Sequence, residues 1–330
     1  MRVEPRLSIA TWKYNKEWVY SISYDEALAD LARFVIPAHE DLGIPGHVEV
    51  VASQIGQVRA CGSSSYNGMR HMNADELKAL VAMGWGVGNH SWSHGKVMDD
   101  PETELLRSKQ AIEAAIGRPV TVYTSCGDNQ NLTPDVQAKL REYGYLAGMS
   151  ITDDINRPDA EDLLWVNRVP IHERYWGVFD SAFDPYKRIR QAQVEHGWIV
   201  DYLHCPLEQP VHPYKDCSAA HHRERLEAVV EAGEGSCWFA NPDDVVDYRC
   251  MRRHTQIEPD AEAPGRFVVK LESLPEQVRC RDLTFKLKSP WTPEATSILA
   301  NGSRIRALTT RAGVLSFTIN VPDGGVSLSF

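Results

Sequence analysis

Residues 84–94 read Gly-Trp-Gly-Val-Gly-Asn-His-Ser-Trp-Ser-His. The short apolar run 84–87 predicts a buried strand that ends just before His90. At the spacing of His90 and His94, two imidazoles can converge on one metal ion from a single turn of backbone, and borderline divalent metals favour such ligands. Two polar loop residues, in a chain with 12 histidines, are the competing interpretation. Polar residues at the ends of other predicted strands favour the metal site.

The alternation of strands and helices continues on both sides of this stretch, to about residue 250. Further strands are predicted at 18–24, 47–52, 120–123, 145–149, 163–169, 198–204 and 236–239. Helices are predicted at 26–36, from the capping box at Asn73, and at 101–116, 133–143, 184–196, 218–232 and 241–250. The first of them is expected to end at Pro37. Seven or eight units with such apolar strands indicate an α/β fold, a distorted (β/α) barrel that is closed or partly closed.

The pattern changes after residue 255. Residues 257–265 have the composition of a linker, and short alternating segments follow at 266–271, 283–288, 297–300, 314–319 and 326–330. Asn301-Gly302 is a hairpin signal. We therefore predict two domains, a barrel at 1–255 and a small antiparallel β domain at 256–330. We expect the β domain to act as a lid or an oligomer contact rather than to bind carbohydrate, because Trp291 is its one Trp and it has no Tyr.

Composition excludes several classes of function. The net charge is −10 without a basic block, which argues against nucleic acid and anionic membranes as partners. No apolar stretch reaches the roughly 18 residues of a membrane span, and the charged start, residues 1–6, lacks a signal core. Seven scattered cysteines without a Cys-x-x-Cys pair favour free thiols over disulfides or a structural zinc cluster. We expect a cytoplasmic protein.

In a (β/α) barrel the chemistry lies at the carboxyl ends of the strands. Candidate functional side chains follow six of the predicted strands. They are Asp25 and Glu26, His90 and His94, Cys126, Asp153 and Asp154, Arg168, and His204. Chance seldom places two adjacent carboxylates, a spaced histidine pair and an isolated histidine at such positions.

Three of these positions resemble the polysaccharide deacetylases, carbohydrate esterase family 4, whose barrel is the NodB-homology domain. Residues 23–27, Ser-Tyr-Asp-Glu-Ala, resemble the family's first motif, Thr-Phe-Asp-Asp-Gly. Residues 90–94 match its second motif, His-Ser/Thr-x-x-His, and residues 202–204, Tyr-Leu-His, approximate its late Leu-x-His motif. The resemblance covers about residues 18–250. It implies the barrel fold and says nothing of the β domain.

The resemblance also implies a set of roles. Glu26, His90 and His94 would hold a divalent ion, zinc by preference, with cobalt or nickel as alternatives. The ion would activate water and polarise an acetyl carbonyl. Asp25 would be the general base, and His204 would protonate the departing amine.

The sequence departs from the family pattern at three places. Glu26 stands where the family has Asp, so Asp25 remains an alternative metal ligand. The third motif, an Arg followed by an aromatic residue and Pro, is absent from 122–127, and Arg168 is expected to replace its arginine in orienting Asp25. Asp153 and Asp154 match the fourth motif loosely, with Asp154 as a supporting residue. We expect Trp92 to line the site.

We predict a metal-dependent hydrolase of a C–N bond that removes acetyl from an N-acetylated sugar or a related small amide. A cytosolic glycoconjugate precursor fits better than an external polymer, and a homo-oligomer is compatible with the β domain. The alternatives are a catalytically silent saccharide-binding protein and a thiol amidase with Cys126 as nucleophile and His204 as base. His221 and His222, on a charged helix, are expected to face solvent.

Overall fold

The computed structural model describes residues 5–60, 63–160, 162–176, 184–263, 265–288, 297–306, 308–311 and 314–330. The chain forms two compact units. One comprises Trp18–Asp244, and the other combines Met1–Glu17 with Val245–Phe330. Trp291 lies outside the described residues.

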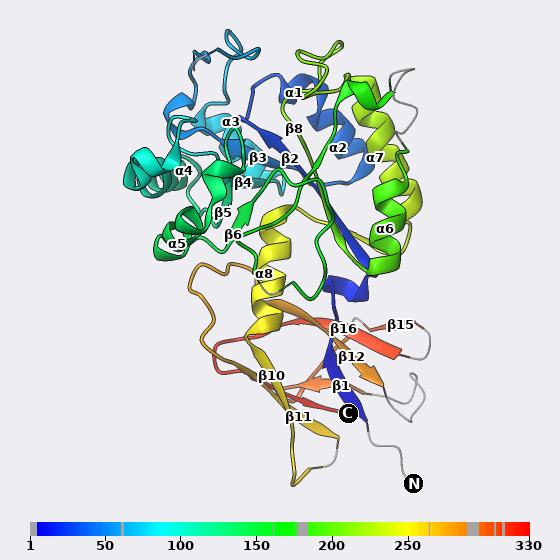
Figure 1. Cartoon of the computed structure of the whole chain (residues 1–330). Helices are drawn as coiled ribbons and strands as arrows, with labels where there is room; N and C mark the ends of the chain where they lie inside the picture. The colour runs from blue at the N-terminus through cyan, green and yellow to red at the C-terminus, as the bar shows by residue number, and fades with distance from the viewer. Residues whose placement is uncertain are drawn as a thin grey trace. The chain divides into compact units, whose positions relative to one another are not determined.

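A curled parallel sheet forms the centre of the first unit (Figure 1). Its strands run in the order β6-β5-β4-β3-β2-β8-β7, and β9 pairs with β2. They are β2 (Trp18–Asp25), β3 (His47–Val50), β4 (Gly86–Asn89), β5 (Val122–Thr124), β6 (Ala147–Met149), β7 (Val169–Pro170), β8 (Trp198–Leu203) and β9 (Cys237–Phe239). Every residue of β2 is buried, as expected for a strand covered on both faces.

The two edges of this sheet are bridged by the segment 163–168. The amide of Ser150 donates to the carbonyl of Val166 (2.8 Å), and the amide of Gly148 donates to that of Leu163 (2.9 Å). Only Val169–Pro170 of the predicted strand 163–169 forms a named strand, β7, which pairs with β8. The sheet is therefore a distorted barrel, and the fold class predicted from the sequence is confirmed.

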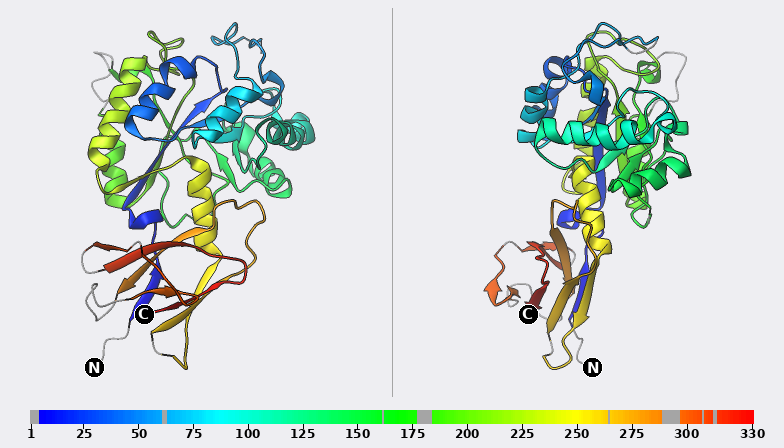
Figure 2. Two further views of the ribbon diagram at one scale, coloured as in Figure 1. Left: turned by 180° about the vertical axis from the view of Figure 1, so that it is seen from behind. Right: turned by 90° about the vertical axis from the view of Figure 1, so that its left-hand side faces the viewer.

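Helices flank the sheet on two sides. Figure 2 shows α3 (Ala74–Ala82), α4 (Ser108–Ile116) and α5 (Pro134–Glu142) on one side, and α6 (Lys187–Glu195) and α7 (Ala219–Gly233) on the other. The capping box of α3 is present, with Asn73 accepting from the amide of Glu76 and Glu76 from that of Asn73. α8 (Pro242–Arg253) spans the boundary between the units. Short 3-10 turns lie at η2 (Ala52–Gln54), η3 (Val97–Asp99), η5 (Asn129–Leu132) and η6 (Glu173–Trp176). The π-helix η4 (Glu102–Arg107) runs directly into α4. Every helix within the described ranges is too short or too polar to cross a bilayer.

The helix predicted at 26–36 was wrong in its bounds. Glu26 and Ala27 have φ angles of 73° and 47°, so the chain makes a left-handed turn after β2. Two short helices follow, α1 (Leu31–Phe34) and α2 (Ile36–Leu42). Pro37 lies in the first turn of α2, where proline is tolerated because the helix needs no amide donor there. The consequence is that Glu26 lies in a turn directly behind β2.

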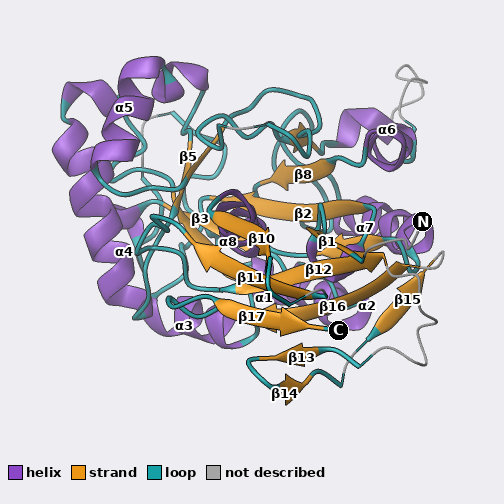
Figure 3. Ribbon diagram, turned by 90° about the horizontal axis from the view of Figure 1, so that it is seen from below, coloured by secondary structure: helices purple, strands orange, loops and turns teal. Residues whose placement is uncertain are grey.

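The second unit consists of two antiparallel sheets (Figure 3). One contains β1 (Arg6–Ile9), β12 (Asp282–Lys288), β16 (Val314–Asn320) and β15 (Thr309–Arg311). The 3-10 turn η1 (Lys13–Asn15) follows β1 in the sequence. The other contains β10 (Thr255–Pro259), β11 (Arg266–Leu271), β17 (Val326–Ser329), β13 (Leu299–Ala300) and β14 (Ser303–Arg304). The predicted antiparallel β-structure and its Asn301-Gly302 hairpin are confirmed, the latter with φ angles of 47° and 80°.

Two features of this unit differ from the sequence analysis. The supposed linker 257–265 contains most of β10, which pairs with β11. The N-terminal strand β1 pairs with β12, so Arg6–Ile9 belongs with the C-terminal sheets rather than with the barrel. The division into compact units thus falls inside α8, about ten residues before the boundary drawn at 255/256.

Candidate active site

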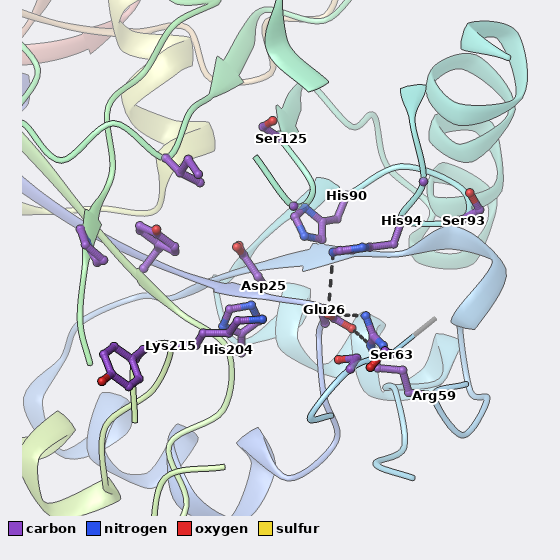
Figure 4. Close-up of a pocket in the computed structure, with 17 residues that line it drawn as sticks. Asp25, Glu26, Arg59, Ser63, His90, Ser93, His94, Ser125, His204 and Lys215 are labelled. Atoms are coloured by element: carbon purple, nitrogen blue, oxygen red, sulfur yellow. Dashed lines mark hydrogen bonds and ion pairs between the residues drawn. The ribbon is translucent and has the colours of Figure 1, made fainter. Parts of the chain in front are cut away.

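Five of the predicted functional residues line one cleft of about 580 Å³ at the carboxyl ends of the barrel strands (Figure 4). Asp25 is the last residue of β2 and Glu26 follows it, His90 follows β4, and His204 follows β8. His94 completes this set, and all five side chains line the cleft. Both histidines and both carboxylates thus line a common cleft. The sequence prediction that they lie within reach of one ion stays a prediction.

Arg168 binds both oxygens of Asp25. Its Nη1 donates to Oδ1 (2.6 Å) and its Nη2 to Oδ2 (3.3 Å), while its Nε donates to the carbonyl of Ser150 (2.9 Å). The guanidinium is fully buried and lies over the ring of Tyr202, 4.2 Å from its centroid. Burial by itself raises the pKa of Asp25, but the charges of Arg168 and the other nearby groups outweigh it and hold the pKa below its ordinary value. Asp25 is therefore ionised at neutral pH.

His90 has a defined tautomer. Its Nδ1 lies 3.1 Å from the carbonyl of Thr124, which can only accept, so Nδ1 carries the proton and Nε2 keeps its lone pair. Burial lowers the pKa of His90 to about 3, and burial also lowers that of His94. Both imidazoles are neutral at pH 7, with ring centroids 5.0 Å apart.

The loop that carries His94 is held by Glu104. This carboxylate, from η4, accepts from the amides of Trp92 and Ser93 (3.0 Å each) and from the Ser93 hydroxyl (2.6 Å). The amide of His94 donates to the Ser91 hydroxyl (2.9 Å). Ser91 and His94 have φ angles of 70° and 62°, a conformation that non-glycine residues adopt only when their surroundings impose it. The loop is thus built to aim His94 into the cleft.

Glu26 is bound by an arginine that the sequence analysis did not identify. Arg59, from the loop between β3 and α3, donates from Nε to Oε2 and from Nη2 to Oε1 (2.7 Å) of Glu26. These interactions hold the pKa of Glu26 below its ordinary value although burial raises it. His71 donates from Nδ1 to the carbonyl of Glu26 (2.6 Å), and its Nε2 lies 3.8 Å from Oε2. Both partners come from the loop 55–72.

His204 is positioned by its backbone and by a stacked ring. Asp216 accepts from the amide of His204 (2.8 Å) with one oxygen and from the Tyr66 hydroxyl (2.6 Å) with the other. The ring of Tyr66 stacks on that of His204, with centroids 4.6 Å apart and planes 17° apart. The Nδ1 of His204 is 3.7 Å from Asp216, which is beyond hydrogen-bond range.

Residues 14–147, which include β2 and the loop of His90 and His94, match the family model of the polysaccharide deacetylases. This segment is therefore similar to the polysaccharide deacetylase family, over less than half of the chain. Among curated proteins no sequence matches the chain.

Solved structures of deacetylases are similar to the chain at low identity. A polysaccharide deacetylase from Bacillus cereus is 18% identical with a TM-score of 0.36, covering 46% of each chain. A deacetylase from Streptococcus pyogenes in complex with acetate is 15% identical with a TM-score of 0.39, covering 46% of this chain and 63% of the other. A peptidoglycan deacetylase from Bacillus subtilis is 12% identical with a TM-score of 0.41, covering 70% and 90%. The chain thus spans about half to two thirds of the length of the first two.

As they are paired in the structure, the residues of the cleft do not fit the divalent ion that the resemblance implies. Nε2 of His94 lies 3.8 Å from Oε1 of Glu26, which is close to the spacing of two ligands on one zinc ion, so this distance does not exclude the ion. The misfit lies in the partners of the two carboxylates. Both oxygens of Glu26 are bound by Arg59, and both oxygens of Asp25 by Arg168. Within the described part of the chain, no three His, Cys, Asp or Glu side chains converge closely enough to hold a metal.

None of the four supporting residues predicted from the sequence lines the cleft. Arg168 contacts Asp25 from a fully buried position, and the other three make no such contact with the site. Trp92 packs against the hydrophobic core, because Ser93 and His94 take the cleft-facing positions of the loop. Asp154 has a half-exposed side chain and pairs with Arg188 (3.1 Å). Cys126 is buried, which raises the pKa of its thiol to about 11, so it is protonated and unreactive at neutral pH.

The site residues missed by the sequence analysis are Arg59, His71, Glu104 and Asp216. None of them follows a strand directly, so the rule that located the others does not reach them. A weaker signal was available for Asp216: a buried histidine at a barrel mouth needs a carboxylate or carbonyl to orient it. Lacking its position in space, that signal does not choose among 45 acidic residues.

Proposed function

We propose that this protein hydrolyses a C–N bond, removing acetyl from an N-acetylated sugar or a related small amide. The observation that carries the proposal is the pair Asp25 and His204, which line one cleft. The buried Arg168 holds the carboxylate of Asp25, and the buried Asp216 accepts from the backbone amide of His204. A pure binding protein has no need of a base and an acid so arranged. The family match over residues 14–147 supports the same reaction class.

The proposed reaction uses the residues in turn. Asp25 takes a proton from a water molecule as its oxygen forms a bond with the carbonyl carbon, and Arg168 keeps the Asp25 carboxylate oriented for that transfer. Neutral His90, with its Nε2 lone pair free for the cleft, accepts a hydrogen bond from the water or the substrate. His204 gives a proton to the nitrogen as the C–N bond breaks, which turns a poor leaving group into a neutral amine.

The polar residues that line the cleft are suited to a substrate that carries hydroxyl groups. Ser93, Ser125, Tyr202 and Lys215 line it beside the proposed base and acid. Hydroxyl and ammonium groups of this kind donate to and accept from sugar hydroxyls.

Acetate release from a panel of N-acetylated sugars and amides tests the proposal. We expect release with at least one substrate, and a fall of about 10²–10⁴-fold in turnover for Asp25→Asn, because an amide cannot accept the proton of water. His204→Ala should lower kcat far more than it changes KM, since its contribution arises as the amine departs. Arg188→Gln, which alters an ion pair outside the cleft, is the control. Release that survives Asp25→Asn would contradict the proposed base.

The metal-dependent form of this reaction, with zinc, cobalt or nickel on Glu26, His90 and His94, remains a prediction from the resemblance. It requires Arg59 to give up at least one oxygen of Glu26. Assays with a chelator and with each added metal separate the two forms.

The Arg59–Glu26 pair also favours a second candidate, a saccharide-binding protein without catalytic activity. An ion pair that closes the family's metal position is the change expected when catalysis is lost. Binding of an N-acetylated sugar without acetate release, unaffected by Asp25→Asn, would support this candidate over the hydrolase.

A further inference from the structure

Glu26 occupies the position where the resemblance implies a metal-binding carboxylate, yet its oxygens face a guanidinium. Figure 4 shows Arg59 and His94 approaching Glu26 from different sides. We propose that Arg59 is the resident cation of this cleft, which replaces the divalent ion, and that the protein catalyses the proposed hydrolysis without bound metal. This inference rests on the proposed function for its catalytic part and stands alone for its metal-binding part.

The pair is buried and geometrically defined. The side chains of Arg59 and Glu26 are each 3% exposed, and two guanidinium nitrogens reach the two carboxylate oxygens. Nη1 of Arg59 donates to the side-chain oxygen of Asn67 (3.0 Å). A two-point contact of this kind fixes the plane of the guanidinium as well as its position. Arg59 is therefore held in the cleft wall, not resting there as a flexible surface side chain.

The backbone on both sides of the pair is also fixed. The amide of Arg59 donates to the carbonyl of Met69 (2.8 Å), and its carbonyl accepts from the amide of Gly68 (3.0 Å). On the other side, His71 binds the carbonyl of Glu26, which is itself held at a φ of 73°. Arg59 and His71, which both hold Glu26, thus lie in the described stretches 55–60 and 63–72, and they tie these stretches to the turn after β2.

The departure of the sequence from the family pattern has a geometric reason in this arrangement. The glutamate side chain places its carboxylate about one carbon–carbon bond length farther from the backbone than aspartate does. This added length lets both oxygens of Glu26 contact Arg59. The same extension brings Oε1 to 3.8 Å from His94, so the positive charge of Arg59 and the neutral imidazole share one carboxylate. An Asp at position 26 would be expected to break the two-point contact.

A guanidinium in this place can do the electrostatic work of a metal ion. When water adds to the carbonyl carbon, the carbonyl oxygen gains negative charge, and a fixed cation in the cleft wall stabilises it. The water proton goes to Asp25, the C–N bond breaks with a proton from His204, and acetic acid and amine leave. No electron transfer and no further reactant are required. His90 and His94, being neutral, bind water or substrate by hydrogen bonds.

Zinc binding to the purified, chelator-treated protein tests this without an assay of activity. We expect no stoichiometric zinc binding by calorimetry in the unaltered protein. Arg59→Met removes the charge but keeps the length, and should raise zinc affinity by about ten- to a hundredfold, the range by which groups around a ligand change metal affinity. Arg70→Met is the matched control. Arg70 lies on the same loop as Arg59 and forms an exposed two-point pair with Glu76 of α3, so its replacement should leave zinc affinity unchanged.

Stoichiometric zinc binding by the unaltered protein, lost in His94→Ala, would overturn the proposal. The proposal would also be overturned if the Arg59→Met protein folds, as judged by circular dichroism, but binds zinc no better than the Arg70→Met control. If Arg59→Met fails to fold, Glu26→Asp provides the second variant, since it weakens the pair and should likewise gain zinc affinity. If no substrate of the proposed class is found, these measurements still decide whether Arg59 excludes the metal.

If a substrate is found, its hydrolysis tests whether Arg59 replaces the ion in catalysis. Activity that persists in the presence of a chelator supports metal-free hydrolysis, and activity that needs added zinc contradicts it.

Discussion

Two arginines dominate the electrostatics of the cleft, and each binds both oxygens of one carboxylate. Arg168 binds Asp25 and Arg59 binds Glu26. All four side chains are at most 6% exposed, so bulk water screens these charges weakly. Removing one partner from such a buried pair leaves the other charge uncompensated, which is costlier than the pair itself is favourable.

Arg168 is the residue whose role is most sharply testable. Arg168→Lys keeps the charge but loses the two-point contact, so the pKa of Asp25 should rise, and the acidic limb of the pH–activity profile should move to higher pH. The sign follows because Asp25 acts in its ionised form, which Arg168 now stabilises. Arg168→Met should lower the free energy of unfolding by about 3–5 kcal/mol in urea titrations. An unmoved acidic limb in Arg168→Lys would show that Asp25 is not the titrating base.

At the scale of elements, η4 acts on the cleft through a single side chain. Glu104 accepts from two amides and a hydroxyl of the loop 91–95, which presents His94. The helix predicted at 101–116 includes Glu104, but nothing in its pattern relates this residue to a loop ten residues earlier.

Glu104→Gln should therefore loosen the loop without changing the volume of the side chain. Its amide group would face donors at Trp92 or Ser93, and one unsatisfied buried group costs about 1–3 kcal/mol. We expect that loss in the free energy of unfolding, faster amide hydrogen exchange at residues 92–94, and reduced turnover. Glu102→Gln, an exposed residue of the same turn that pairs with Arg107, is the control. Unchanged exchange in Glu104→Gln would mean that backbone conformation alone holds the loop.

Helices α2 and α7 meet strand β2 through buried histidines. The Nδ1 of His39 donates to the carbonyl of Ile44 (2.7 Å), so its Nε2 accepts from the Tyr24 hydroxyl (2.6 Å), which in turn accepts from Nε2 of His222 (2.6 Å). The expectation that His222 faces solvent was wrong: it is fully buried, while its neighbour His221 is partly exposed and contacts Glu173. A charged helix can still bury one polar residue when that residue completes a hydrogen-bond chain.

This chain of histidines predicts a loss of stability in mild acid. Burial lowers the pKa of His39 to about 4. As the pH falls below about 6.5, the unfolded chain takes up a proton that the folded protein refuses, so stability decreases until the folded pKa is reached. The decrease should amount to about 3 kcal/mol between pH 7 and pH 4 for His39 alone. The free energy of unfolding, measured by urea titration at several pH values in this range, should depend less steeply on pH for His39→Gln than for the control His196→Asn. His196 lies at an exposed helix end. Equal slopes would contradict the assignment.

At the scale of the whole molecule, an N-terminal strand completes a sheet formed by C-terminal strands. The smaller unit pairs β1, from residues 6–9, with β12, from residues 282–288, in antiparallel register. Its sheet β1-β12-β16-β15 therefore depends on both ends of the sequence.

Removal of residues 1–11 should destabilise this sheet. Without β1, strand β12 becomes an edge with unpaired backbone groups, which promotes aggregation. We expect faster proteolysis within residues 245–330 and a lower temperature of unfolding. A shorter truncation that removes only residues 2–4 and leaves β1 intact is the control. Equal protease resistance of the two truncated proteins would show that β1 contributes little to the sheet.

The sequence by itself determined the order of the β/α units, the antiparallel C-terminal strands and the residues that follow the strands of the barrel. Asp25, His90 and His204 could be located in this way because the carboxyl ends of parallel strands meet at one mouth, whatever the details of packing. Helix and strand bounds were less well predicted where a turn such as Glu26–Ala27 left no periodic signal.

Only the tertiary structure decided which partner each charge acquires. Arg59 is 33 residues from Glu26, Arg168 is 143 from Asp25, and Tyr66 is 150 from Asp216. A carboxylate accepts from any donor that folding brings within about 3 Å, and no local pattern records which one that will be. The same sequence motif is therefore compatible with a metal site or with an arginine in its place, and only the structure shows that Arg59 lies beside Glu26.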